Sequence, residues 1–210
     1  MRFADLDAVT VDGFGTLVEL IDPVPDLAAM LRRHGTQRPD DVVRSAFAVE
    51  AGHYRAHSLT GRTPESLGVL RRQCTKVFLD AAGVSLDAAA LAPEFVAALR
   101  FRLLPDAEAA LTSLRSRGLE LAVVSNWDIS LHGRIEELGL GALVTTVVTS
   151  ADAGAEKPDP RIFELALARL GVRSDRVLHI GDSAADERGA VAVGLRFQPA
   201  PLDEALSRWR

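Results

Sequence analysis

The chain has 210 residues, of which 48% are hydrophobic, and its formal net charge is −5. This apolar fraction can fill one large domain or a core domain with an inserted module. The acidic balance, with no run of Lys or Arg, argues against nucleic acid as the main partner. No apolar stretch approaches the length of a membrane span, and the first residues do not resemble a signal peptide. Because Cys74 is the single cysteine, an internal disulfide is excluded, and we expect a cytoplasmic protein.

The first predicted strand covers residues 8–11 and is followed at once by a carboxylate. Its residues are Ala-Val-Thr-Val, and Asp12 comes directly after them. The next residues, 13–17, include two glycines, which favour a sharp turn. This pattern predicts a buried strand that presents the carboxylate of Asp12 at the edge of a sheet.

Residues from about 20 to 100 show helical spacing of apolar residues and no convincing strand. The expected helices cover residues 26–34, 39–57, 64–82 and 87–99, and the expected linkers cover residues 23–25 and 100–105. The pattern therefore predicts an all-helical domain, residues 19–100, inserted after the first strand.

Helix and strand patterns alternate from residue 104 to residue 198. The expected helices cover residues 105–117, 131–138, 159–170 and 184–193, and the expected strands cover residues 121–124, 144–148, 177–180 and 195–197. Such alternation is typical of parallel strands joined by right-handed crossovers. We therefore expect an α/β core domain with a Rossmann-like doubly wound parallel sheet, formed by residues 1–18 and 101–210.

Polar residues follow the later predicted strands as Asp12 follows the first. Ser125-Asn126 comes after one strand, Lys157 follows the next strand through a loop, and Gly181-Asp182 ends a third. In open α/β sheets, ligands bind just beyond the carboxyl ends of the strands. These polar groups therefore belong to one candidate site.

Together these motifs resemble the haloacid dehalogenase superfamily of hydrolases. That family carries, in order, an Asp nucleophile in Asp-x-Asp-Gly-Thr, a Ser or Thr after the second strand, a Lys, and an acidic Gly-Asp-x-x-x-Asp motif. Here they correspond to Asp12 through Thr16, Ser125, Lys157, and Gly181 through Asp186. The resemblance spans nearly the whole chain. It implies that the helical insertion is a cap that covers the site and opens by hinge motion.

The resemblance also implies a Mg²⁺-dependent phosphohydrolase that acts on a small phosphorylated metabolite. Asp12 would attack phosphorus and form an aspartyl-phosphate that water then hydrolyses. Lys157 would offset the charge of Asp12 and hold a phosphoryl oxygen. Ser125, helped by Asn126, would bind the oxygens of the transferring group.

The expected magnesium ligands are Asp12, the main-chain oxygen of Phe14, Asp182 and Asp186. The spacing of the last two predicts that both lie on the first turn of a helix and face the same way. Carboxylates that meet in a small site repel one another, and a hard dication with oxygen ligands relieves this repulsion. Simple N-capping by Asp182 is the alternative interpretation, and Glu187 is a competing candidate for the second acid.

Phe14 stands where phosphatases of the resembled family have the Asp that protonates the leaving oxygen. Such acid–base help is worth about 10²- to 10⁴-fold in rate, and a phenyl group cannot supply it. Two alternatives therefore stay open. One is a metal-independent 2-haloacid dehalogenase, which shares the aromatic residue but has lost the metal-binding Asp. The other is a non-catalytic protein that binds phosphate or a partner on the same scaffold.

Other residues have less specific signals. His53 and His57 lie four apart on one helix face, which favours packing or a substrate contact over zinc, since no third ligand is near in sequence. Trp127 and Asp128 either line the mouth of the pocket or pack between helices. Thr16 is expected to tie down the turn after the first strand. The sequence does not indicate the oligomeric state.

Overall fold

The computed structural model describes residues 2–209, which form two compact units. The first unit runs up to Glu19 and resumes at Arg102, and the second unit is Leu20–Phe101. Two short strands, β2 (Val18–Leu20) and β3 (Phe101–Leu103), pair where the chain passes between the units. The sequence predicts no strand at either place, because a run of three residues is too short for its periodicity to show.

The first unit contains a parallel five-stranded sheet in the order β5-β4-β1-β6-β7. Its strands are β1 (Ala8–Val11), β4 (Glu120–Ser125), β5 (Thr146–Thr149), β6 (Val177–Gly181) and β7 (Arg196–Pro199). The first strand lies in the middle, where Ala8 pairs with Glu120 on one side and with Val177 on the other. This arrangement confirms the expected α/β class and the distant origin of the central strand.

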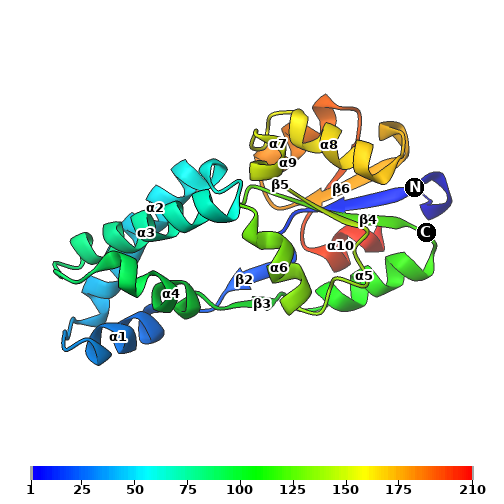
Figure 1. Cartoon of the computed structure of the whole chain (residues 1–210). Coiled ribbons are helices and arrows are strands. Elements are labelled where there is room, and N and C mark those ends of the chain that lie inside the picture. The colour runs from blue at the N-terminus through cyan, green and yellow to red at the C-terminus, as the bar shows by residue number, and fades with distance from the viewer. Residues whose placement is uncertain (1, 210) are drawn as a thin grey trace. The chain divides into compact units, whose positions relative to one another are not determined.

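Helices cover both faces of this sheet (Figure 1). Figure 1 shows α8 (Arg161–Leu170) and α9 (Ala184–Ala192) on one face, and α5 (Ala107–Ser116) and α10 (Leu202–Ser207) on the other. The remaining helices of this unit are α6 (Ser130–Glu137), α7 (Ser150–Ala153) and the 3-10 helices Phe3–Asp5 and Ser174–Arg176. A strand covered on both faces is buried along its whole length, and all four residues of β1 are buried, including the polar Thr10.

Several boundaries differ from the sequence-based expectation, and two of the differences have a local cause. The strand expected at 144–148 begins only at Thr146, because Leu143 and Val144 donate their N–H groups to Leu140 O and form a turn. The helix expected from residue 159 begins at Arg161, whose N–H donates to Asp159 Oδ1. Helices α7 and α10 are too short to show a helical period in the sequence.

The second unit is helical apart from the residues at its ends that belong to β2 and β3. It contains α1 (Val24–Arg33), α2 (Asp40–His57), α3 (Pro64–Ala81), α4 (Ala88–Ala98) and the 3-10 helix Ser58–Thr60. The expected helices are all present, although α1 begins inside the segment expected to be a linker. Phe78 and Phe95 join α3 to α4, with ring centroids 5.2 Å apart. None of the helices in the described part of the chain is both long and apolar enough to cross a membrane.

The face of the sheet under α8 and α9 has a closely packed core. Phe163 of α8 is fully buried there, together with Val124, Ile162 and Ala190. Burial of apolar side chains at this density is what holds these two helices against the sheet.

We expect the Phe163→Ala substitution to lower the free energy of unfolding by about 3–5 kcal/mol, because it removes a buried ring and leaves a cavity. Urea unfolding followed by circular dichroism measures the change. The control is Val191→Ala on α9, since Val191 is 58% exposed and exposed positions change stability by about 0.5 kcal/mol or less. Equal effects of the two substitutions would contradict this description of the core.

Candidate active site

Residues from four distant segments meet at the carboxyl edge of the sheet. Asp12 follows β1, Ser125 ends β4, Lys157 lies between α7 and α8, and Asp186 lies in the first turn of α9. Hydrogen bonds join all four side chains into one group. The structure thus brings together residues that the sequence places in one candidate site.

Lys157 is at the centre of this group. Its ammonium donates to Asp12 Oδ1 at 2.5 Å, to Asp186 Oδ1 at 2.5 Å and to the main-chain oxygen of Val124 at 3.0 Å. Burial opposes the charge, yet the two carboxylates outweigh it and raise the pKa of Lys157. Because an ammonium has three N–H donors, the three acceptors use all of them. In this state Lys157 offsets the charge of Asp12, and its expected contact with a phosphoryl oxygen stays a prediction.

The two oxygens of Asp12 have different surroundings. Oδ1 accepts from Lys157 and also from the hydroxyl of Ser125 at 3.1 Å. Oδ2 accepts no hydrogen bond from the residues that the structure describes. Burial raises the pKa of Asp12, and the nearby ammonium offsets part of that effect. The oxygen that remains available for chemistry is therefore Oδ2.

Asn126 holds the Lys157 segment in place. Its side-chain oxygen accepts from the Lys157 N–H at 2.7 Å, and its amide nitrogen donates to Lys157 O at 3.2 Å. Both ends of the side chain are thus used on one main-chain unit. The role expected for Asn126 at the substrate stays a prediction, while its positioning role is one that the sequence analysis missed.

Asp182 and Asp186 do not share a helical turn, so the expectation from their spacing is wrong. The helix begins at Ala184, and its N-cap is Ser183 rather than Asp182. Asp182 lies before the helix and is exposed, whereas Asp186 is buried inside the first turn. The serine takes the N-cap position because its hydroxyl accepts from Asp186 N and its N–H donates to Asp186 Oδ2.

Both carboxylate oxygens of Asp186 are hydrogen-bonded to other residues of the protein. Oδ1 accepts from Lys157 and lies 3.0 Å from His179 Nε2, and Oδ2 accepts from Ser183 N at 3.2 Å and from its hydroxyl at 2.5 Å. Although burial favours the neutral acid, these donors lower the pKa of Asp186. His179 lies on β6 and contacts Asp186. It is a site residue that the sequence analysis missed. A histidine inside an otherwise apolar strand was the available signal.

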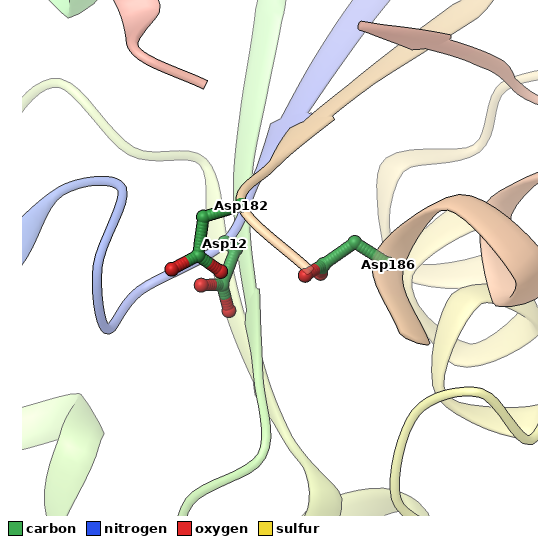
Figure 2. A group of neighbouring side chains, drawn as sticks. All are labelled: Asp12, Asp182 and Asp186. Carbon is green, nitrogen blue, oxygen red and sulfur yellow. The ribbon is translucent and has the colours of Figure 1, made fainter. Parts of the chain in front are cut away.

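Three carboxylates come close enough to hold one metal ion. Figure 2 shows Asp12 and Asp182 side by side, with Asp186 directed toward them from α9. One oxygen of each lies within 4.8 Å of the others. Partial burial and the charge of Asp186 raise the pKa of Asp182. Of these acids, Asp12 and Asp186 pair with the Lys157 ammonium, and the oxygen donors of the cluster are those that Mg²⁺ prefers.

Phe14 and Thr16 lie in the turn after β1. The phenyl group is 51% exposed, and its centroid lies 6.3 Å from that of Trp127. The hydroxyl of Thr16 is buried and has no hydrogen-bond partner among the described residues. The expectation that it ties down the turn is therefore wrong. Main-chain bonds close the turn instead, because Leu17 N and Val18 N both donate to Gly13 O at 2.9 Å.

The remaining candidate residues lie outside the acidic cluster. Glu187 is exposed and does not belong to it. Trp127 and Asp128 are 8% and 4% exposed, which favours packing, and Asp128 Oδ1 accepts from Ser130 N at 2.7 Å. In the second unit, His53 and His57 stack with centroids 4.1 Å apart, and no metal-ligand cluster among the described residues includes them.

Gly15 allows Asp182 to approach the turn after β1. Its φ is +86°, and a Cβ at this position would overlap the carboxylate of Asp182. Gly139 is a matched control, since its φ is +77° and a Cβ there would meet nothing within 4 Å. At either position an alanine would suffer backbone strain of about 1–2 kcal/mol. Only Gly15 adjoins the acidic cluster.

We expect Gly15→Ala to weaken Mg²⁺ binding by about 10-fold or more, because it displaces one carboxylate of the cluster. Gly139→Ala should lower stability to a similar extent and leave Mg²⁺ affinity unchanged. Isothermal titration of both variants with MgCl₂ measures the affinity, and thermal unfolding measures the stability. The same Mg²⁺ affinity in both variants would show that Asp182 does not contribute to an ion site.

Known proteins of one family are similar to this chain. Residues 6–194 match the family of haloacid dehalogenase-like hydrolases. The chain is 38% identical over 215 residues to the haloacid dehalogenase-like hydrolase domain-containing protein 3 of Mus musculus, covering 94% of this chain and 84% of that one. It is 38% identical over 108 residues to the ribulose-1,5-bisphosphate 5-phosphatase of Halopiger xanaduensis, covering 49% of this chain and 45% of that one.

A solved structure that is named a dehalogenase, and not a phosphatase, is also similar to this chain. The L-2-haloacid dehalogenase of Xanthobacter autotrophicus superposes with a TM-score of 0.67 at 25% identity, covering 97% of this chain and 81% of that one. The chain is thus similar both to a phosphatase and to a dehalogenase. The match to the family covers most of the chain, and this protein therefore belongs to the haloacid dehalogenase-like hydrolases.

Proposed function

We propose that this hydrolase is a Mg²⁺-dependent phosphohydrolase that acts on a small phosphorylated metabolite. The observation that carries the proposal is the cluster of Asp12, Asp182 and Asp186, which each place one oxygen within 4.8 Å of the others, while Lys157 pairs with two of them. The ribulose-1,5-bisphosphate 5-phosphatase of Halopiger xanaduensis matches about half of this chain, and it supports phosphate-ester hydrolysis as the reaction class. A small phosphorylated molecule is the partner that such a site would bind.

Asp12 is the nucleophile in this proposal. Oδ2 attacks phosphorus, the bond from phosphorus to the leaving oxygen breaks, and that oxygen departs with the electron pair. Water then attacks the phosphorus of the aspartyl-phosphate, which releases inorganic phosphate and restores the carboxylate. Lys157 fixes Oδ1 throughout, so the reacting oxygen keeps its direction.

The residues present fit a magnesium ion. Asp12, Asp182 and the main-chain oxygen of Phe14 would hold it, while Asp186 would add its charge and keep Lys157 in place. When bound, the ion would supply positive charge to the phosphoryl oxygens and reduce the repulsion between the carboxylates. Ser125 would then donate to the oxygens of the transferring group.

Phe14 determines which leaving groups suit the site. Phe14 supplies no proton at this position, so leaving groups that depart without one suit the site. Aryl and acyl phosphates meet this requirement, because their leaving groups are stable anions. The helical unit, Leu20–Phe101, is proposed to act as the cap that selects the substrate, and the cytoplasm is the expected compartment.

With Mg²⁺, the purified protein should hydrolyse an aryl phosphate such as p-nitrophenyl phosphate at least about 10-fold faster than glycerol phosphate. Excess EDTA should abolish phosphate release, because the acidic cluster would lose its counter-charge. Asp12→Asn is the matched control, since it keeps the shape of the side chain and removes the nucleophile. Equal rates on the two esters would contradict the role given to Phe14.

A second candidate function is a metal-independent 2-haloacid dehalogenase. The aromatic Phe14 and the similarity to a solved dehalogenase favour it. Chloride release from 2-chloropropionate that persists in excess EDTA would displace the phosphohydrolase proposal. The absence of both activities, with no beryllium fluoride bound at Asp12, would instead support a non-catalytic binding protein.

The Phe14→Asp substitution should raise kcat on glycerol phosphate by about 100-fold, because it supplies the missing general acid. The rate on p-nitrophenyl phosphate should change little, since that leaving group needs no proton. Phe14→Leu is the control, because it also removes the ring but adds no acid. If Phe14→Asp does not raise kcat on glycerol phosphate, Phe14 does not limit the hydrolysis of alkyl phosphates.

A further inference from the structure

His179 is fully buried and has a partner on each ring nitrogen. It lies on β6, directly opposite Thr10 of β1, with 0% of its surface exposed. Nδ1 is 2.9 Å from the hydroxyl of Thr10, and Nε2 is 3.0 Å from Asp186 Oδ1. Phe163 meets the ring edge-on at 4.8 Å and Phe197 lies at 6.2 Å. The imidazole is therefore held in one orientation.

The partners of the ring select one tautomer. The carboxylate Asp186 Oδ1 can only accept, so Nε2 must carry a proton. In the neutral ring Nδ1 is then an acceptor, and the hydroxyl of Thr10 donates to it. Thr10 and Asp186 thus fix which nitrogen of His179 is protonated.

The hydrogen bond from His179 reaches the nucleophile through two further residues. Asp186 Oδ1 also accepts from Lys157, and Lys157 donates to Asp12 Oδ1. A side chain at residue 181 would overlap Asp186, so Gly181 leaves the space in which this carboxylate lies. The buried residues form one continuous series, from Thr10 through His179, Asp186 and Lys157 to Asp12.

We propose that His179 is a positioning residue of this site. Its Nε2–H orients Asp186, which holds the Lys157 ammonium against Asp12 Oδ1 and thereby leaves Oδ2 as the reacting oxygen. The inference rests on the proposed phosphohydrolase function and adds a fully buried residue that acts through Asp186. A partner that orients a reacting group from behind typically contributes about 10- to 100-fold in activity.

Three variants test this role in the full-length protein with Mg²⁺ and p-nitrophenyl phosphate. His179→Leu removes both ring nitrogens and should lower kcat about 10- to 100-fold with KM little changed. His179→Gln keeps an N–H that can donate to Asp186 and should recover most of the loss. Thr10→Val keeps the shape of the threonine but removes its hydroxyl, so kcat should fall while the strand stays intact.

The control for lost stability is Leu178→Ala. Leu178 is the neighbouring residue on β6 and is fully buried, and this substitution should destabilise the fold without lowering kcat. The ¹⁵N resonances of the His179 ring give a readout other than activity. In the wild type they should show a protonated Nε2 and an unprotonated Nδ1, and Thr10→Val should shift the Nδ1 resonance, which loses its hydrogen-bond donor, while Nε2 stays protonated against Asp186.

The outcomes separate this inference from the proposed function. Wild-type phosphatase activity together with an unchanged kcat in His179→Leu would overturn the positioning role alone. Equal losses in His179→Leu and Leu178→Ala, or no recovery in His179→Gln, would also overturn it. A wild-type protein that hydrolyses no phosphate ester would overturn the proposed function and this inference with it.

Discussion

The ammonium of Lys157, buried between Asp12 and Asp186, is the interaction on which the site depends. The two carboxylates lie 145 and 29 residues away from this lysine in the chain. An unpaired charge in a protein interior costs several kcal/mol, so the fold is stable only if these segments meet. The central strand, the segment after α7 and the start of α9 are thereby held at one edge of the sheet.

This ion-pair group divides the site into a fixed part and an open part. On the inner side, Lys157, Asp186 and Asp12 Oδ1 make hydrogen bonds within the protein. On the outer side, Asp182 is exposed and Asp12 Oδ2 accepts no bond from the described residues. A rigid inner layer keeps reacting groups in place without reorganisation during the reaction. The same division leaves Asp182 and Asp12 Oδ2 on the side where the proposed cation would bind.

Phe14 separates two functions that one residue usually combines in the phosphatases of this family. Its main-chain oxygen stays available to a metal ion whatever the side chain is, whereas its phenyl group cannot transfer a proton. The chain therefore keeps the electrostatic part of the expected site and lacks the acid. Because one scaffold hosts many chemistries, the site residues decide the reaction class and the sheet does not.

The sequence alone determined the alternation of helices and strands, the helical insertion and the residues Asp12, Ser125, Lys157, Asp182 and Asp186, because local periodicity and turn chemistry depend on near neighbours. It did not determine the 3-residue strands β2 and β3, the N-cap at Ser183 or the role of His179. The pairing of β2 with β3 and the role of His179 depend on contacts between distant residues, whereas the N-cap rests on the local capping box of Ser183 with Asp186, which the sequence analysis missed. Only the tertiary structure brought Thr10, His179 and Asp186 together, since a buried polar side chain takes its role from whichever partner satisfies its hydrogen bonds.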